Sequence, residues 1–80
     1  MSERILRLPT VKTLSGLSRS SIYLRISEGL FPRSLALGRR MVGWPESEIA
    51  AINAARIRGE SEEEIRSLVA KLESARKSAA

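Results

Sequence analysis

The chain has 80 residues, of which 42% are hydrophobic and 29% are charged, and these values describe one small domain with a thin margin of stability. It contains no cysteine and no histidine, and all nine acidic residues are glutamate, which excludes disulfides, thiolate or imidazole metal ligands, cysteine nucleophiles and a histidine general base. We therefore expect a protein that is not an enzyme and that needs neither a cofactor nor a metal.

The positive charge is concentrated in the first half of the chain. Fourteen basic residues, eleven of them arginine, stand against nine acidic residues and give a net charge of +5. Residues 1–44 contain eight basic and two acidic residues, a net +6, whereas residues 45–80 contain six basic and seven acidic residues, a net −1. Arginine pairs with phosphate and with guanine edges through its planar guanidinium. The asymmetry therefore favours an anionic partner, although solubility alone would also account for it.

No segment of the sequence indicates export or membrane insertion. The first residues include the charged Glu3, Arg4 and Arg7 and no apolar run of signal-peptide length. No uncharged stretch approaches the length that a membrane-spanning helix needs. We expect a cytoplasmic, nucleoid-associated protein with no membrane partner.

The N-terminal segment predicts a short extended element followed by a helix. The apolar run at residues 5–8 ends at Pro9, and we interpret it as a short strand or an extended lead-in. Proline is favoured at the first position of a helix, so we predict a helix over residues 9–15. Gly16 ends this helix because glycine adopts the backbone conformations of a tight turn.

A second short helix is predicted immediately after this turn. Ser18 is a good N-cap for a helix over residues 19–28, and Gly29 stands where a C-terminal glycine cap is expected. Within this helix Ile22 and Ile26 are four residues apart and should face the core. The two helices together form a helix-turn-helix pattern.

A β-hairpin is predicted next. Residues 34–37 and 41–44 are short runs of strand-compatible residues, and Gly38-Arg39-Arg40 between them is typical of a hairpin tip. We call this hairpin, at about residues 35–44, the wing. Trp44 is interpreted as a core anchor that holds the wing against the helices, and Phe31 is also expected in the core.

Two further helices are predicted in the second half of the chain. Pro45 starts a third helix that ends near Arg58, and residues 61–64 form an S-x-x-E capping box that starts a fourth. The fourth helix has one apolar stripe, made of Ile65, Leu68, Val69 and Leu72. This stripe either folds back onto the core or pairs with another copy. We therefore expect a domain at residues 1–60 and a C-terminal helix within 61–80, with residues 74–80 frayed.

The exposed face of the predicted helix 19–28 is the best candidate for a nucleic-acid contact. Its serine hydroxyls could donate to phosphates or base edges, and arginine can grip guanine with two hydrogen bonds. Leu24 on the same face could touch a thymine methyl group or simply pack, and an ordinary solvated face is the alternative. The candidate residues are Ser18, Arg19, Ser20, Ser21, Tyr23 and Arg25.

The hairpin tip strengthens this interpretation. Arg39 and Arg40 would flank the helix and reach phosphates or the minor groove, whereas the alternative is a charged turn that protects a sheet edge. Lys12 and Arg33 are further candidate phosphate contacts. A helix-turn-helix followed by a basic hairpin predicts a mainly α fold with a small β-hairpin, a winged helix-turn-helix domain plus a C-terminal helix.

The chain resembles the AlpA family of phage regulatory proteins over about residues 4–58. The segments that carry the resemblance are Ile5-Leu-Arg-Leu-Pro9, Gly16-Leu-Ser-Arg-Ser-Ser-Ile-Tyr23, Glu28-Gly-Leu-Phe-Pro32, Leu37-Gly-Arg-Arg40 and Val42-Gly-Trp44. The resemblance implies a small bacterial or prophage DNA-binding protein, related to the MerR-type and excisionase winged helices. Members of the family activate transcription of integrase or other mobile-element genes, or act as excision factors.

By position, the resemblance assigns Arg19, Ser20, Ser21, Tyr23 and Arg25 to a recognition helix and Arg39 and Arg40 to a wing. We therefore expect a sequence-specific regulator that binds double-stranded DNA, with a second copy, RNA polymerase or an integrase as protein partners. One alternative is an excision factor that bends DNA for an integrase. Another is a small interaction module whose arginine-rich face binds an acidic protein.

Overall fold

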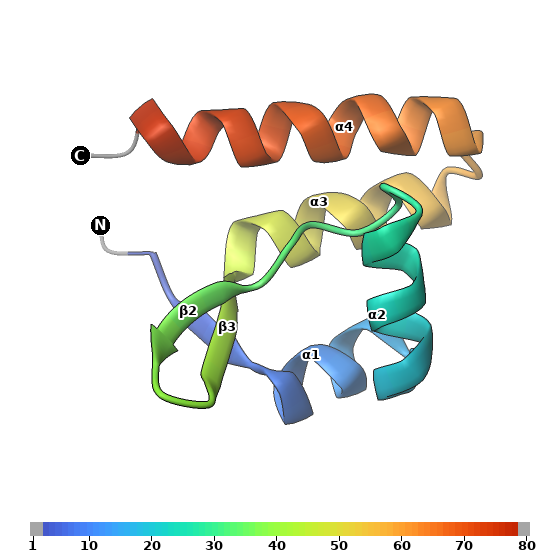
Figure 1. Cartoon of the computed structure of the whole chain (residues 1–80). Helices are drawn as coiled ribbons and strands as arrows, with labels where there is room; N and C mark the ends of the chain where they lie inside the picture. The colour runs from blue at the N-terminus through green and yellow to red at the C-terminus, as the bar shows by residue number, and fades with distance from the viewer. Residues whose placement is uncertain (1–2, 79–80) are drawn as a thin grey trace.

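The computed structural model of the protein describes residues 3–78, which form a winged helix with an additional C-terminal helix (Figure 1). In chain order the elements are β1 (Ile5–Arg7), α1 (Leu8–Ser15), α2 (Arg19–Ser27), β2 (Leu35–Gly38), β3 (Met41–Pro45), α3 (Glu46–Ile57), α4 (Glu62–Ala75) and a 3-10 turn, Arg76–Ser78. The predicted mainly helical fold with a small hairpin is confirmed. None of the helices within the described residues is long and apolar enough to cross a membrane.

The hairpin is part of a three-stranded antiparallel sheet with the order β1-β3-β2. β1, which the sequence predicted as a strand or a lead-in, pairs with β3 so that Leu6 stands opposite Trp44. The prediction that the third helix begins at Pro45 is wrong, because α3 begins at Glu46. Pro45 is the last residue of β3, and its extended backbone (φ −61°, ψ 135°) makes it the N-cap of α3.

Local capping explains where the two helices of the helix-turn-helix begin and end. Gly16 closes α1 in the left-handed conformation (φ 71°), and the Ser18 hydroxyl accepts a hydrogen bond of 3.1 Å from the Ser21 N–H at the start of α2. α2 ends at Ser27, one residue before the predicted end, because Gly29 has a positive φ of 76°. Both predicted caps are therefore confirmed.

One hydrophobic core joins the four helices with β1, β3 and the connection after α2. Trp44 is fully buried, its indole N–H donates to the Pro32 carbonyl over 2.8 Å, and the edge of its ring system contacts Phe31 with ring centres 6.1 Å apart. The predicted core positions of both aromatic residues are thus confirmed. The core residues are Leu6, Val11, Ile22, Leu30, Phe31, Trp44, Ile49, Ile52, Ala55, Ile65 and Val69.

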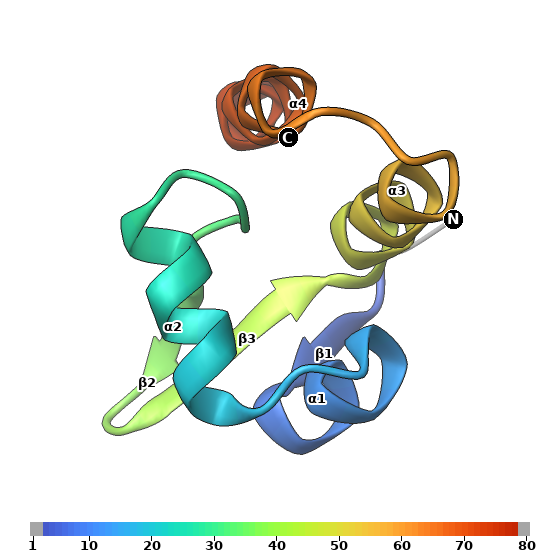
Figure 2. The same ribbon diagram turned by 90° about the vertical axis from the view of Figure 1, so that its right-hand side faces the viewer.

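α4 packs on this core through its apolar stripe. Ile65 and Val69 are buried, and Leu68 and Leu72 lie half-buried against the other core residues. The predicted capping box is present, since the Ser61 hydroxyl accepts from the Glu64 N–H and the Glu64 carboxylate accepts from the Ser61 N–H. α4 lies at the opposite end of the molecule from α1 and the hairpin tip (Figures 1 and 2).

The end of the chain is more ordered than its composition predicted. The expected fraying of residues 74–80 is wrong up to residue 78, and Ala79 and Ala80 lie outside the described residues. Arg76 forms an ion pair with the buried Glu48 at the start of α3, with N–O distances of 2.6 and 2.8 Å. The hydrogen bonds to the Glu48 carboxylate raise the pKa of Arg76, so its guanidinium stays charged at any physiological pH.

The neighbours of Gly43 in the central strand leave no room for a side chain at this position. A Cβ atom there would lie 2.7 Å from Ile5 Cγ2 and 2.9 Å from Leu37 Cδ1. We expect Gly43→Ala to lower the free energy of unfolding by about 2 kcal/mol, because the side chains of Ile5 and Leu37 must shift. Gly16→Ala is the matched control, since its Cβ meets nothing within 4 Å and only the left-handed backbone is strained. Urea denaturation measures both, and a Gly43→Ala variant as stable as wild type would contradict this packing.

Candidate nucleic-acid interface

α2 presents a mixed basic and apolar face to solvent next to the hairpin. Arg19, Ser20 and Tyr23 are exposed, and Arg25 is half-buried near the end of the helix. Leu24 is 59% exposed, so its side chain is not used to pack against the core. The face that the sequence predicted as outward therefore does point outward.

The serines of this helix differ in what their hydroxyls already bind. Ser18 and Ser21 bond to each other over 3.0 Å as part of the cap, and Ser27 donates to the Leu24 carbonyl over 2.6 Å. The Ser20 hydroxyl makes no hydrogen bond with any other described residue. Ser20 is consequently the serine whose hydroxyl is available to a partner without loss of helix capping.

A groove of about 530 Å³ lies where α2, β1 and the hairpin meet. Its basic and polar lining comes from Arg7 of β1, Arg19 and Tyr23 of α2, and Arg40 of the hairpin tip. The Arg19 guanidinium carbon lies 5.7 Å from the centre of the Tyr23 ring, a cation–π contact that orients the guanidinium without neutralising it. Three cationic side chains from distant segments thus surround one opening.

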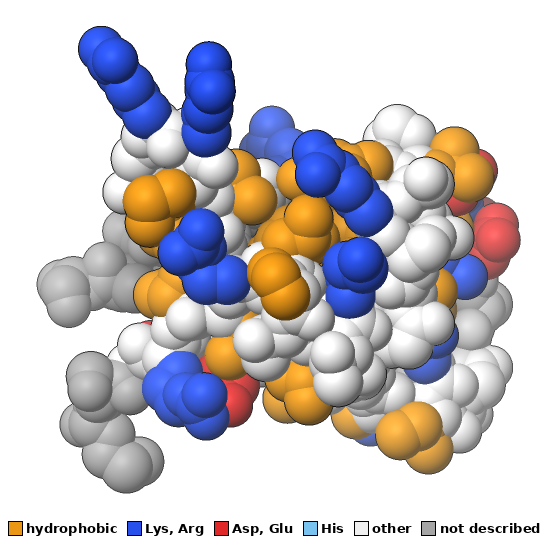
Figure 3. Space-filling model, turned by 90° about the horizontal axis from the view of Figure 1, so that it is seen from below, with side chains coloured by type: hydrophobic (Ala, Val, Ile, Leu, Met, Phe, Trp, Pro, Cys, Tyr) orange, Lys and Arg blue, Asp and Glu red, His pale blue; other side chains and the backbone are white. Residues whose placement is uncertain are grey.

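The hairpin tip extends this basic surface. Arg39 and Arg40 are both exposed in the turn between β2 and β3, and Arg40 has a positive φ of 58°. Figure 3 views the molecule from the side of α1 and the tip, and Lys and Arg side chains are spread over this face while acidic side chains are sparse. The face is therefore electropositive.

The arginines of the chain divide into two groups by their partners. Six of them bind carboxylates or backbone carbonyls: Arg4 with Glu46, Arg33 with Glu73, Arg56 with the Ser15 carbonyl, Arg58 with Glu60, Arg66 with Glu62 and the Glu28 carbonyl, and Arg76 with Glu48. The other five have no such partner within residues 3–78, and they are Arg7, Arg19, Arg25, Arg39 and Arg40. The uncompensated guanidinium charge thus belongs to β1, α2 and the hairpin tip.

Two candidate phosphate contacts lie away from the groove lining. Lys12 is exposed on α1. Arg33 lies in the connection between α2 and β2, where its Nε–H and its backbone N–H both donate to Glu73 of α4, over 3.3 and 2.8 Å. The structure therefore places Arg33 beside α4 and engages its guanidinium in an ion pair.

Arg7 is a groove residue that the sequence reasoning missed. Leu6 is buried and its two neighbours are exposed, so alternation along β1 sends Arg7 to the face opposite the core. The sequence does not show this alternation, because the exposed Ile5 is as apolar as the buried Leu6. Arg7 reaches the groove because β1 pairs with β3, with Arg7 opposite Gly43.

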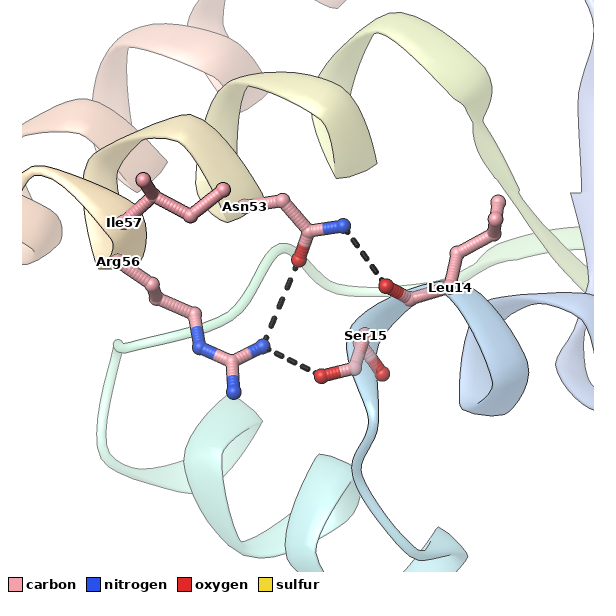
Figure 4. Close-up of a pocket in the computed structure, with 5 residues that line it drawn as sticks. All are labelled: Leu14, Ser15, Asn53, Arg56 and Ile57. Carbon is pink, nitrogen blue, oxygen red and sulfur yellow. Dashed lines mark hydrogen bonds between the residues drawn. The ribbon is translucent and has the colours of Figure 1, made fainter.

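A second hollow, of about 410 Å³, lies between the end of α1 and α3 (Figure 4). There the Asn53 amide donates to the Leu14 carbonyl over 2.9 Å, and Arg56 donates to the Ser15 carbonyl over 2.7 Å. The last carbonyl groups of a helix have no hydrogen-bond donor within the helix. These two bonds supply donors to the Leu14 and Ser15 carbonyls and attach the end of α1 to α3. The hydrogen bonds in this hollow therefore hold the helix-turn-helix against α3.

Comparison with known proteins places the chain in a family. The family model described as "Prophage CP4-57 regulatory protein (AlpA)" matches residues 4–56. The chain is 51% identical over 57 residues to "Uncharacterized protein ORF88" of Enterobacteria phage P4, an alignment that covers 71% of this chain and 65% of that protein. The chain thus spans slightly less than two thirds of the length of this phage relative.

A second relative has a descriptive name. The chain is 40% identical over 52 residues to "DNA-binding transcriptional activator AlpA" of Escherichia coli K12, covering 58% of this chain and 74% of that protein. No solved structure matches the chain significantly. The family match includes β1, the helix-turn-helix, the hairpin and nearly all of α3, and α4 lies beyond it. The chain therefore belongs to the AlpA family of prophage regulatory proteins.

Proposed function

We propose that the protein binds double-stranded DNA sequence-specifically and regulates transcription of a prophage or another mobile element. The observation that supports this most directly is the grouping of the five unpartnered arginines on β1, α2 and the hairpin tip. A surface of guanidinium groups without carboxylate partners matches the phosphate backbone of a duplex. The name of the Escherichia coli relative supports activation of transcription, for which RNA polymerase is the expected protein partner.

In the proposed complex α2 enters the major groove. Ser20, Leu24 and Arg25 face the base edges, where a hydroxyl, a methyl-contacting side chain and a guanidinium each distinguish different bases. Three arginines hold the phosphates beside α2, and they are the basic lining of the groove, Arg7, Arg19 and Arg40. The wing holds the flanking backbone through its exposed tip.

One copy of the protein presents a single short helix to the DNA. α2 has nine residues, which limits the number of base pairs that one copy contacts. Tight binding consequently requires two or more copies on repeated sites. The stripe of α4 is already used by the core, so contact between copies would use another surface.

A salt titration tests the proposed function. Genomic fragments that the protein retains are sequenced to obtain the site, and fluorescence anisotropy then measures affinity for that duplex and for a scrambled duplex. With about four phosphates neutralised, we expect a slope of about −3.6 in log affinity against log salt, or a loss of about 150-fold between 50 and 200 mM. The selected site should bind more tightly than the scrambled one at every salt concentration. No measurable duplex binding at low salt would contradict the proposal and favour an acidic protein partner.

A further inference from the structure

The segment that connects α2 to the wing is short, and its middle is buried. It spans residues 28–34, and within it Leu30, Phe31 and Pro32 are in the interior. Its first turn is set by the end of α2, where the Leu30 N–H donates to the Arg25 carbonyl over 2.8 Å. Any change in this connection would alter the position of the wing relative to α2.

α4 binds the beginning of this connection through Arg66. The Arg66 Nε–H donates to the Glu28 carbonyl over 2.8 Å, directly after the last residue of α2. The aliphatic part of the same side chain covers Gly29, with Arg66 Cγ 3.6 Å from the position that a Cβ would occupy. One side chain of α4 thus holds the end of α2 by a hydrogen bond and by packing.

α4 and the turn after it also bind the end of the connection. The Glu73 carboxylate accepts the backbone N–H of Arg33 over 2.8 Å, and Arg76 donates to the backbone carbonyl of Arg33 over 2.7 Å. Both backbone groups of Arg33, two residues before β2, are therefore satisfied by α4 and the turn after it. Arg76 is itself held by the buried Glu48, so this attachment is fixed to α3 as well.

These contacts have a common geometry. Arg66 and Glu73 are seven residues apart, two turns of helix, so they lie on the same side of α4 and face the two ends of one segment. The bonds go to backbone groups, and their geometry therefore fixes the path of the chain as well as adding stability. α4 spans the connection, with one end of the segment at each attachment.

We propose that α4 sets the position of the wing relative to α2, and that Arg66, Glu73 and Arg76 are positioning residues for DNA binding. The proposal rests on the proposed function as far as DNA is concerned. α2 and the wing must meet the major groove and the flanking backbone at the same time, so a fixed distance between them avoids an ordering cost on binding. α4 contributes by preorganisation and touches no DNA.

The chain has no cysteine, so introduced cysteines allow a direct distance measurement in the full-length protein. Spin labels are attached at Ser27→Cys and Ala36→Cys in the protein without DNA. Double electron–electron resonance then measures the distribution of distances between α2 and β2. We expect a narrow distribution in the otherwise unchanged protein and a broader one with Glu73→Ala. Glu73→Gln should restore the narrow distribution, since the amide oxygen still accepts the Arg33 N–H. Lys71→Ala, an exposed change on the same helix, should have no effect.

DNA affinity is measured on the same variants without labels. Glu73→Ala should weaken binding about tenfold, and Glu73→Gln should recover most of this loss. Arg66→Met is the second test, because it keeps the stem over Gly29 and removes the bond to the Glu28 carbonyl, together with the exposed ion pair to Glu62 on α4 itself. It remains informative if Glu73→Ala fails to fold.

Two results would overturn the proposal, and both can be distinguished from the result that would overturn the proposed function. Unchanged distances in both Glu73→Ala and Arg66→Met would show that α4 does not position the wing. Broadened distances with unchanged affinity would show that the position of the wing does not matter for DNA. If the wild-type protein bound no duplex, the proposed function and the DNA part of this proposal would fail together, while the distances would still decide the role of α4.

Discussion

The double substitution Arg19→Ala with Arg39→Ala should weaken binding to the selected duplex about 100-fold, about tenfold for each guanidinium. Neither arginine has a carboxylate or carbonyl partner in the described part of the chain, so their removal breaks no ion pair within the protein. The circular dichroism spectrum and the melting temperature should therefore stay close to those of wild type. The slope of log affinity against log salt should become less steep by about two, because two phosphate contacts are lost.

The matched control removes the same charge from another surface. Lys71→Ala with Lys77→Ala also lowers the net charge by two, from exposed positions in α4 and the turn after it. If α2 and the wing contact the DNA, this control should lose less than about threefold in affinity through the weaker long-range field alone. Equal losses in the two double variants would contradict the assignment of Arg19 and Arg39, since they would show that only the total charge matters.

Trp44→Ala should lower the free energy of unfolding by about 4 kcal/mol. The side chain is fully buried between the sheet and the helices, and its loss removes the contact with Phe31 and leaves the Pro32 carbonyl without a donor. A chain of this size has a total stability of roughly 4–12 kcal/mol, so this one change should remove about a third or more of it. Urea denaturation followed by far-UV circular dichroism measures the change.

Two further variants separate the causes of this loss. Trp44→Phe keeps an aromatic ring but not the indole N–H, and we expect a loss of about 2 kcal/mol from the smaller ring and the unsatisfied Pro32 carbonyl. Tyr23→Ala removes an aromatic side chain that is partly exposed, and should cost less than about 1 kcal/mol. A Trp44→Ala variant no less stable than Tyr23→Ala would be incompatible with the core role of Trp44.

The secondary structure was predictable because its signals are local. The hydrogen bonds of the Ser18 cap and of the capping box at residues 61–64 join residues three apart, so the sequence alone contains both partners. Gly16 and Gly29 end their helices for an equally local reason, a positive φ. The start of α3 was misplaced by one residue because Pro45 is compatible both with the first turn of a helix and with the end of an extended strand.

The candidate site was predictable where one element supplies it. The exposed residues of α2 follow from the helical period once Ile22 faces the core, and the basic hairpin tip follows from its turn residues. Arg7 was missed because its place in the groove depends on the pairing of β1 with β3, across 36 residues in the register Arg7↔Gly43. The contact between Arg33 and Glu73 spans 40 residues and was equally invisible.

By itself, the sequence determined that positive charge is in excess, that it is mostly arginine, and that it lies in the first half of the chain. Only the tertiary structure decided which of these arginines are available to a partner. Arg4 and Arg33 belong to the same basic half, yet each is paired with a glutamate about 40 residues away. A net charge counts every ionised group, whereas an interface depends on the groups whose charge no neighbour compensates. Salt screens that compensation beyond about 10 Å, so it depends on which groups the fold brings together.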